Sequence, residues 1–188
     1  MGEGRLFVIS APSGAGKSTL IDRIKLQFPD LVYSISCTTR APRGNERDGV
    51  HYYFLTRDQF EEMIGSDGFL EFKEVHGNLY GTPRRQVNEV LKGGGSMILD
   101  IDVMGASEVF KKISNAVGIF INAPGLAALE ERLRRRGTDS EESIRTRMKN
   151  AIREIQEGST FQYRIINDDL EKAVQDLAGI IRKESAFQ

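Results

Sequence analysis

The chain has 188 residues, enough for one hydrophobic core of ordinary size with small subdomains inserted in it. With 39% hydrophobic and 28% charged residues, the composition is that of a globular protein and excludes a disordered one. The formal net charge of -1 excludes a global positive field, so we expect no nucleic-acid or membrane partner. A single cysteine, with no signal-peptide pattern and no apolar run of ~20 residues, favours a cytoplasmic protein.

Short apolar runs alternate with helical patterns along most of the chain. The predicted strands are residues 5–10, 96–101, 117–121 and 164–166. The predicted helices are residues 17–28, 102–113, 126–135, 140–157 and 169–184. Strands that alternate with helices predict an α/β fold, in which a mainly parallel sheet is covered by helices on both faces.

Residues 34–89 break this alternation. They hold short aromatic and alternating segments with few long helical patterns, which predicts an inserted, partly antiparallel subdomain. Near its end, Thr82 and Pro83 have the pattern of a helix N-cap followed by proline at the first helical position.

Residues 124–160 form the second exception. Two strongly charged helical patterns meet at Gly137, and Thr138 and Glu141 have capping-box spacing. Because this segment has little apolar core of its own, it is predicted to form a lid that can move. The predicted core consists of what remains, about residues 1–33, 90–123 and 161–188.

The strongest motif lies between the first predicted strand and the first predicted helix. It reads Ala11-Pro12-Ser13-Gly14-Ala15-Gly16-Lys17-Ser18, followed by Thr19. This is P-loop spacing, in which glycines let backbone N–H groups converge on phosphate oxygens at a helix N-terminus. Lys17 can reach the β- and γ-phosphates, and the Ser18 hydroxyl can ligate Mg²⁺. Although Ala11 stands where the strict motif has glycine, the motif predicts a nucleoside triphosphate as ligand, without specifying the reaction.

Two carboxylates, Asp100 and Asp102, lie at the carboxyl end of the second predicted strand. Ligands of open α/β sheets collect at the carboxyl ends of strands. A carboxylate there can hold a magnesium-bound water, which makes Asp102 a candidate metal ligand together with Ser18. The alternative is that Asp102 simply caps the helix that follows it.

Seven motifs follow the P-loop in a fixed order. They are SISCTTRAPRG at 34–44, DGVHYYF at 48–54, FLEF at 69–72, GNLYGT at 77–82, ILDID at 98–102, RGTDSEESI at 136–144 and INDDL at 166–170. Together they resemble the guanylate kinase family over nearly the whole chain. The resemblance implies a P-loop core with a GMP-binding insert and a helical lid. It also implies Mg²⁺-assisted transfer of the ATP γ-phosphoryl group to GMP, giving ADP and GDP, in purine metabolism and GMP recycling.

The resemblance further implies roles for individual residues. The acceptor phosphate would be held by Arg40, Arg43, Tyr52 and Tyr80. The guanine would be surrounded by Ser36, Glu71, Thr82 and Asp100. ATP would be bound by residues 11–19 with Arg132 and Asn167, although Asn167 could equally cap the last helix with Asp168. The catalytic set would be Lys17, Arg40, Asp100, Arg136 and Arg147.

Elementary chemistry agrees with the role of Glu71. Guanine presents N1–H and a 2-amino group on one edge, and a carboxylate can accept from both donors. Adenine would leave the carboxylate unpaired, and sites built on such hydrogen bonds discriminate by roughly 10⁴-fold. Arg40 and Arg43 offer planar forks to phosphate oxygens.

The charged lid suits a reaction between two polyanions. No general base is needed, because a monophosphate is already anionic near neutral pH. Catalysis then depends on in-line positioning of the two substrates and on arginines that move into the site when both substrates are bound. Arg132 and Arg136 lie four residues apart and share a helix face. The remaining lid arginines are assigned to the solvent-facing surface: Arg134, Arg135 and Arg145.

A regulatory P-loop switch is disfavoured, because nothing in the sequence resembles a guanine-specific triphosphate motif, and two other rival functions remain for a chain of this pattern. One is a catalytically inactive guanylate-kinase-like module that binds partner peptides, which the intact P-loop and the lid arginines disfavour. The other is a different small-molecule kinase on the same scaffold, which the combination of tyrosines and a carboxylate in the base pocket disfavours. The sequence leaves the oligomeric state open.

Overall fold

A parallel sheet of five strands forms the centre of the computed structural model, which describes residues 4–135, 137 and 139–185. Its strands are β1 (Leu6–Ser10), β2 (Val32–Tyr33), β7 (Met97–Asp100), β8 (Val117–Asn122) and β9 (Tyr163–Ile166). They are arranged in the order β2-β7-β1-β8-β9, with every neighbouring pair parallel. The predicted α/β fold with a parallel sheet is therefore confirmed, and the two-residue edge strand β2 was not predicted.

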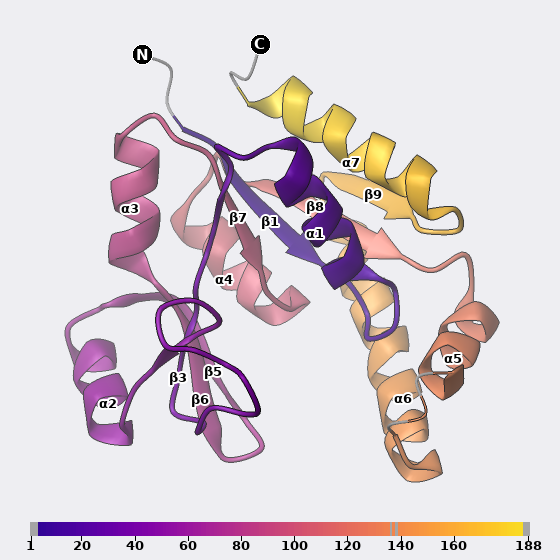
Figure 1. Cartoon of the computed structure of the whole chain (residues 1–188), viewed down its shortest axis with the longest axis horizontal. Helices are drawn as coiled ribbons and strands as arrows, with labels where there is room; N and C mark the ends of the chain where they lie inside the picture. Colours follow the sequence, from indigo (N-terminus) through magenta and orange to yellow (C-terminus); the bar gives the residue numbers. More distant parts are fainter. Residues whose placement is uncertain (1–3, 136, 138, 186–188) are drawn as a thin grey trace.

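Helices cover both faces of this sheet (Figure 1). One face packs against α1 (Lys17–Gln27) and α7 (Leu170–Glu184), and the other packs against α3 (Arg84–Lys92) and α4 (Val103–Lys112). Alternate residues of β1 point to opposite faces of the sheet. All five residues are buried, because helices cover both faces. This burial explains why the central strands are continuous apolar runs.

A second sheet of four strands is formed within residues 37–83. Its strands are β4 (Tyr53–Phe54), β3 (Cys37–Thr38), β6 (Asn78–Pro83) and β5 (Phe69–Val75), in that spatial order. β3 and β4 are parallel, whereas β3–β6 and β5–β6 are antiparallel. The helix α2 (Arg57–Gly65) closes a small core in which the rings of Phe60 and Phe69 stack at 4.3 Å.

Two helix starts differ from the sequence-based expectation. Thr82 is not an N-cap, because it belongs to β6 and its hydroxyl bonds to Glu71; α3 begins at Arg84, with Pro83 at the cap position. The helix α2 was missed, although Thr56 and Gln59 form a capping box at its start.

The charged segment 124–160 contains α5 (Leu126–Arg135) and α6 (Glu141–Glu157), followed by a 3₁₀ turn (Gly158–Thr160). The N-cap of α6 is Ser140, whose hydroxyl accepts from the Ser143 amide. The capping box predicted for Thr138 and Glu141 cannot be placed, because Thr138 lies outside the described residues.

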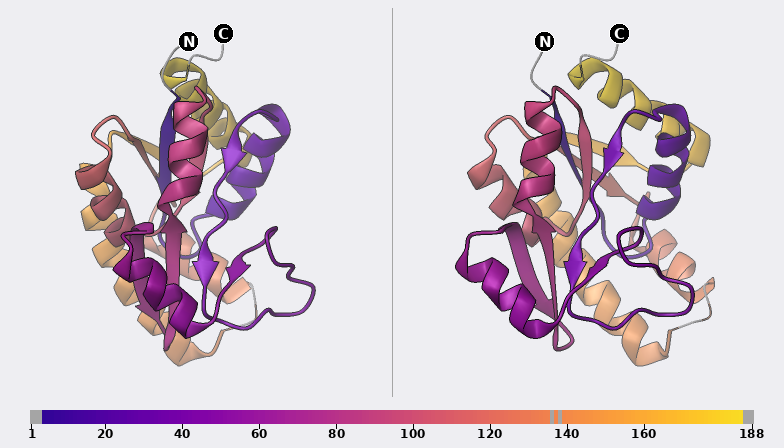
Figure 2. Two further views of the ribbon diagram at one scale, coloured as in Figure 1. Left: turned by 90° about the vertical axis from the view of Figure 1, so that its left-hand side faces the viewer. Right: turned by 60° about the vertical axis from the view of Figure 1, so that its left-hand side comes forward.

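In both views of Figure 2, β1 begins and α7 ends at the end of the molecule opposite α2 and the first turn of α6. The second sheet and the α5–α6 pair therefore project from the same side of the central sheet, where the predicted site residues lie. None of the helices within residues 4–135 and 139–185 is long and apolar enough to cross a membrane.

Candidate active site

The P-loop connects β1 to α1 at the carboxyl end of the central strand. Gly14 and Gly16 have φ angles of 92° and 91°, a region that favours glycine. The Ala15 amide donates to the Pro12 carbonyl at 3.1 Å, which closes the turn. Gly16 occupies the N-cap of α1 and has no side chain to cap it, so the first amides of the helix face the loop.

Asn167 supports the P-loop from the end of β9. Its side chain is buried, and its Nδ2 donates to the Ala15 carbonyl at 2.8 Å. A Cβ at Gly16 would lie 2.4 Å from this amide nitrogen, so the glycine is also required by close packing. The suggestion that Asn167 caps the last helix is wrong, because Asp169 caps α7 through the Lys172 amide.

Lys17 lies at the carboxyl ends of β1 and β7. Its ammonium group pairs with Oδ1 of Asp100 and contacts the Ile101 carbonyl at 3.4 Å. The hydroxyl of Tyr33, on the edge strand β2, donates to Oδ2 of Asp100 at 3.2 Å. Burial, followed by the negative charge of Asp100, raises the pKa of Tyr33, so this phenol remains a donor.

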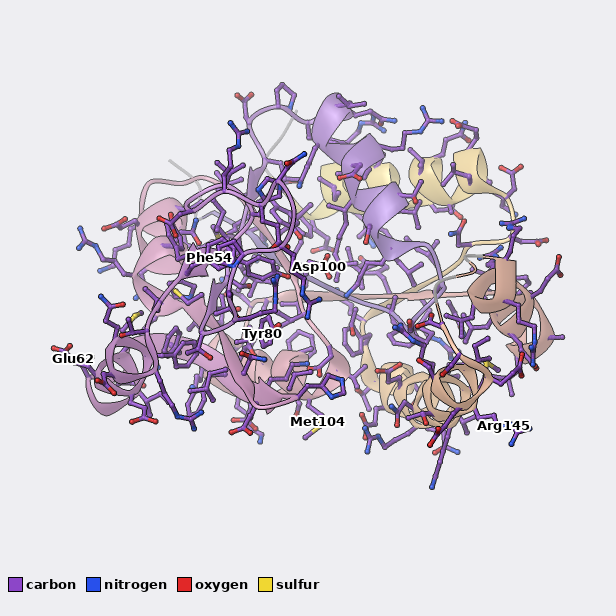
Figure 3. All side chains as sticks on the ribbon, turned by 60° about the horizontal axis from the view of Figure 1, so that its bottom comes forward. Phe54, Glu62, Tyr80, Asp100, Met104 and Arg145 are labelled. Carbon is purple, nitrogen blue, oxygen red and sulfur yellow. The ribbon has the colours of Figure 1, made fainter. Side chains whose placement is uncertain are left out.

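A cavity of 310 Å³ lies beside this lysine, between the two sheets. It is lined by five residues predicted to bind GMP, Ser36, Tyr52, Glu71, Tyr80 and Asp100, by the predicted site residues Lys17 and Asp102, and by Lys73. Figure 3 shows Tyr80 and Asp100 near the middle of the molecule, whereas Glu62 of α2 and Arg145 of α6 lie at opposite ends. Tertiary structure thus brings together residues as distant in the chain as Lys17 and Ile101, which are 84 positions apart.

Glu71 is the buried carboxylate of this cavity, with 6% of the residue exposed. The β5–β6 register shifts between Phe69 and Glu71, an irregularity of the kind that re-aims a side chain. The Thr82 hydroxyl donates to Oε1 of Glu71 at 2.6 Å, which gives Thr82 an indirect place in the site. Burial is the main reason that the pKa of Glu71 is raised.

Asp102 has two structural partners. Its Oδ1 accepts from the Gly105 amide at 2.8 Å, so the N-cap role considered from sequence is confirmed. Its Oδ2 pairs with Lys73 of β5. Burial acts to raise the pKa of Asp102, but the Lys73 and Gly105 contacts outweigh it, and the pKa lies below the usual range.

Arg40 is held rigidly at the edge of the cavity. Only 8% of the residue is exposed; its Nε donates to the Tyr80 hydroxyl at 3.1 Å and its Nη2 to Glu46 at 2.9 Å. The guanidinium carbon lies 5.4 Å from the ring centroid of Tyr52. Arg43 is exposed, and its backbone amide donates to the same Glu46 at 2.8 Å. Glu46 was missed from sequence, where it reads as one charge in a polar loop.

Each of the helices α5 and α6 places an arginine beside the P-loop. Nη1 of Arg147 donates to the Ser13 hydroxyl at 2.7 Å, and both residues line a cavity of 580 Å³. Nη2 of Arg132 donates to the Asn167 carbonyl at 2.8 Å, beside a cavity of 310 Å³ that Gly14, Gly16 and Thr19 also line.

The other arginines of the segment 124–160 differ in their placement. Arg134 and Arg145 are exposed, as expected, and Arg134 pairs with Glu130 and Glu141. Arg135 is exposed too, but it lines the same cavity as Arg132. Arg136, predicted to be catalytic, lies outside the described residues.

The oxygen donors near Lys17 fit a magnesium ion carried mainly by phosphates. Ser18 is exposed in the first turn of α1, and Asp102 contributes a carboxylate. In the described part of the chain, no three His, Cys, Asp or Glu side chains come together as a metal cage. Mg²⁺ in phosphotransferases typically takes one or two protein ligands, with substrate phosphates and waters completing its shell.

A P-loop at the centre of a parallel sheet, flanked by a base-sized cavity and arginine-bearing helices, is the architecture of a P-loop kinase. The sequence model of the Guanylate kinase family matches residues 3–184. The guanylate kinase of Carboxydothermus hydrogenoformans is 51% identical over 184 residues, covering 98% of this chain and 90% of the relative. The guanylate kinase of Escherichia coli (strain K12) is 47% identical over 186 residues, covering 98% of this chain and 90% of the relative.

A solved structure supports the same assignment. The crystal structure of guanylate kinase from Anaplasma phagocytophilum aligns with a TM-score of 0.76 at 32% identity, over 99% of this chain and 88% of that one. The chain therefore belongs to the guanylate kinase family.

Proposed function

We propose that this chain is an ATP:GMP phosphotransferase that converts ATP and GMP to ADP and GDP. The observation that carries the proposal is the buried carboxylate of Glu71, which shares one cavity with Lys17 of the P-loop. A P-loop provides for a triphosphate, and a carboxylate that can only accept hydrogen bonds selects a base edge with two donors. Guanine has that edge.

On the donor side, the P-loop binds the ATP phosphates. The turn at Gly14 and Gly16 directs backbone amides toward these phosphates, and Lys17 neutralises the β- and γ-phosphates. Thr19 lines the cavity beside Gly14 and Gly16. Ala11, Pro12 and Ala15 shape the loop, while Arg132 and Asn167 border the cavity that would receive the adenine. Mg²⁺, held by Ser18 and through water by Asp102, would supply charge neutralisation on the phosphates.

On the acceptor side, Arg40, Tyr52 and Tyr80 form the phosphate-binding cluster, and Arg43 joins it from the adjacent loop. Glu46 supports the cluster by fixing the Arg40 guanidinium. Glu71, Ser36 and Asp100 face the guanine, with Thr82 orienting Glu71. Because the GMP phosphate is already anionic near neutral pH, its oxygen attacks the γ-phosphorus without a general base.

The lid completes the site by adding positive charge. Arg147 already reaches Ser13 of the P-loop, and Arg136 lies earlier in the same segment, 124–160. Both arginines would stabilise the transferring phosphoryl group, an effect worth roughly 10³-fold or more in comparable enzymes. We assign residues 34–89 as the GMP-binding insert and the remainder, about 1–33, 90–123 and 161–188, as the core. The cellular role would be GMP recycling in the cytoplasm.

Tyr33 acts as a positioning residue for Asp100. Tyr33→Phe removes the hydroxyl that donates to Oδ2 and should lower kcat/KM for GMP by about 10-fold, while the KM for ATP stays within about twofold. Steady-state kinetics with each substrate varied will measure this effect. In an Asp100→Asn background the same substitution should add little, so an undiminished effect there would contradict action through Asp100.

A coupled ADP-release assay with GMP, AMP, UMP and CMP tests the function directly. We expect turnover with GMP at least about 10³-fold above that with AMP, because adenine leaves Glu71 unpaired in a buried pocket. A preference for AMP would overturn the assigned specificity. No turnover with any of the four acceptors, in protein that binds ATP, would favour the peptide-binding module or a kinase for another small molecule.

A further inference from the structure

The residue that limits the space around Glu71 is Gly105, in the first turn of α4. A methyl group on Gly105 would lie 2.9 Å from Oε2 of Glu71 and 3.2 Å from its Cδ. Real Cβ atoms essentially never approach another atom within 3.0 Å. The obstacle is a buried carboxylate, not the free end of an exposed side chain, so relief requires Glu71 to move.

The other side of the carboxylate is occupied as well. Oε1 of Glu71 accepts from the Thr82 hydroxyl at 2.6 Å, and Thr82 is fully buried in β6. The helix cannot easily retreat, because Val103, Ala106 and Val109 of α4 are buried in one core cluster with Leu70, the residue before Glu71. The Glu71 carboxylate is therefore held between a hydroxyl of β6 and the bare Cα of a glycine on α4.

Gly105 also separates two negative charges. Its amide donates to Oδ1 of Asp102 at 2.8 Å, and that same oxygen would lie 3.3 Å from a methyl group on Gly105. Oδ2 of Asp102 is paired with Lys73. One residue thus holds the Asp102 carboxylate with its amide and makes room for the Glu71 carboxylate with its missing side chain.

Local helix formation gives no reason for glycine at this position. Gly105 does not have a positive φ and belongs to α4, and glycine within a helix is less favourable than any residue except proline. Gly179, inside α7, provides the contrast, since a methyl group there would meet nothing within 4 Å.

We propose that Gly105 is a specificity-determining positioning residue, whose missing side chain lets the Glu71 carboxylate sit against α4 at the guanine edge. This inference rests on the proposed function. Gly105 would then contribute to guanine recognition through Glu71, without touching the nucleotide itself. A side chain at position 105 would turn the carboxylate away from N1–H and the 2-amino group of GMP.

The test is a double-mutant cycle between positions 105 and 71. Gly105→Ala should lower kcat/KM for GMP by about 10- to 100-fold, mainly through KM, and leave the KM for ATP within about twofold. Glu71→Asp shortens the side chain by one methylene group, so Gly105→Ala should cost less than about twofold in that background. Calorimetric Kd values for GMP should follow the same pattern. Gly179→Ala, the matched control, should leave all these constants unchanged.

Several outcomes would overturn the role of Gly105. These are a Gly105→Ala variant with unchanged GMP constants, an equal loss in the Glu71→Asp background, or an equal loss of ATP and GMP affinity. If neither Gly105→Ala nor the double variant folds while Gly179→Ala does, something other than Glu71 requires the glycine, and the proposal fails. Failure of the unaltered chain to phosphorylate GMP would overturn the proposed function instead.

Discussion

Lys17→Ala should lower kcat for GMP phosphorylation by about 10³-fold or more, the loss expected when a preorganised charge on the transferring phosphoryl group is removed. The ammonium group lies where β1 and β7 end, paired with Asp100 and only 21% exposed. Lys17 owes this position to the P-loop backbone, which determines where the first turn of α1 begins. Coupled ADP-release kinetics at saturating ATP and GMP will measure the effect.

The control for Lys17→Ala is Lys111→Ala, an exposed helical lysine paired with Glu108 on α4. It should leave kcat unchanged. Thermal unfolding of both variants should remain cooperative, because Lys17 makes its contacts at the site rather than in the core. Turnover within about tenfold of the unaltered chain would refute the role assigned to Lys17.

Glu71→Gln should reduce kcat/KM for GMP by about 10²- to 10⁴-fold and leave the KM for ATP nearly unchanged. The amide retains one acceptor oxygen, but its NH₂ group would face a guanine donor, so a hydrogen bond becomes an unpaired buried contact. The Thr82 hydroxyl can still donate to the amide oxygen, which keeps the pocket intact. Kinetics with GMP and ATP varied in turn will separate the two effects.

Stability supplies an independent measurement on the same variant. Burial raises the pKa of Glu71, so folding disfavours its ionised form, and this cost is present when the pH is above the raised pKa. A neutral glutamine should therefore leave the free energy of unfolding at neutral pH unchanged or higher. Glu74→Gln, on the exposed side of β5, is the matched control and should alter neither kinetics nor stability appreciably. Equal damage to GMP and ATP binding by Glu71→Gln would contradict a base-reading role.

Local sequence was sufficient for four of the five strands of the central sheet and for the P-loop. Strand β1 and helix α1 flank a motif whose glycines determine the turn, so the geometry depends on backbone conformations within about ten residues. The boundaries of α4, α5 and α7 were likewise predicted to within a residue or two, since amphipathic periodicity and caps are local signals. Short elements such as β2 and α2 have too few residues for a periodic signal, and these were missed.

The surroundings of the guanine pocket depended on the tertiary structure. Tyr33, Lys73 and Gly105 come from three separate elements, and nothing in their local sequence marks them as neighbours of Asp100, Asp102 and Glu71, respectively. Thr82 illustrates the same point, because its local pattern predicts a helix cap while the pairing of β5 with β6 turns its hydroxyl toward Glu71. The physical reason is that strand register and helix packing, not neighbouring residues in the chain, determine which side chains meet. The sequence by itself therefore determined the family, the P-loop and the carboxylate proposed to read the base, while folding decided what positions that carboxylate.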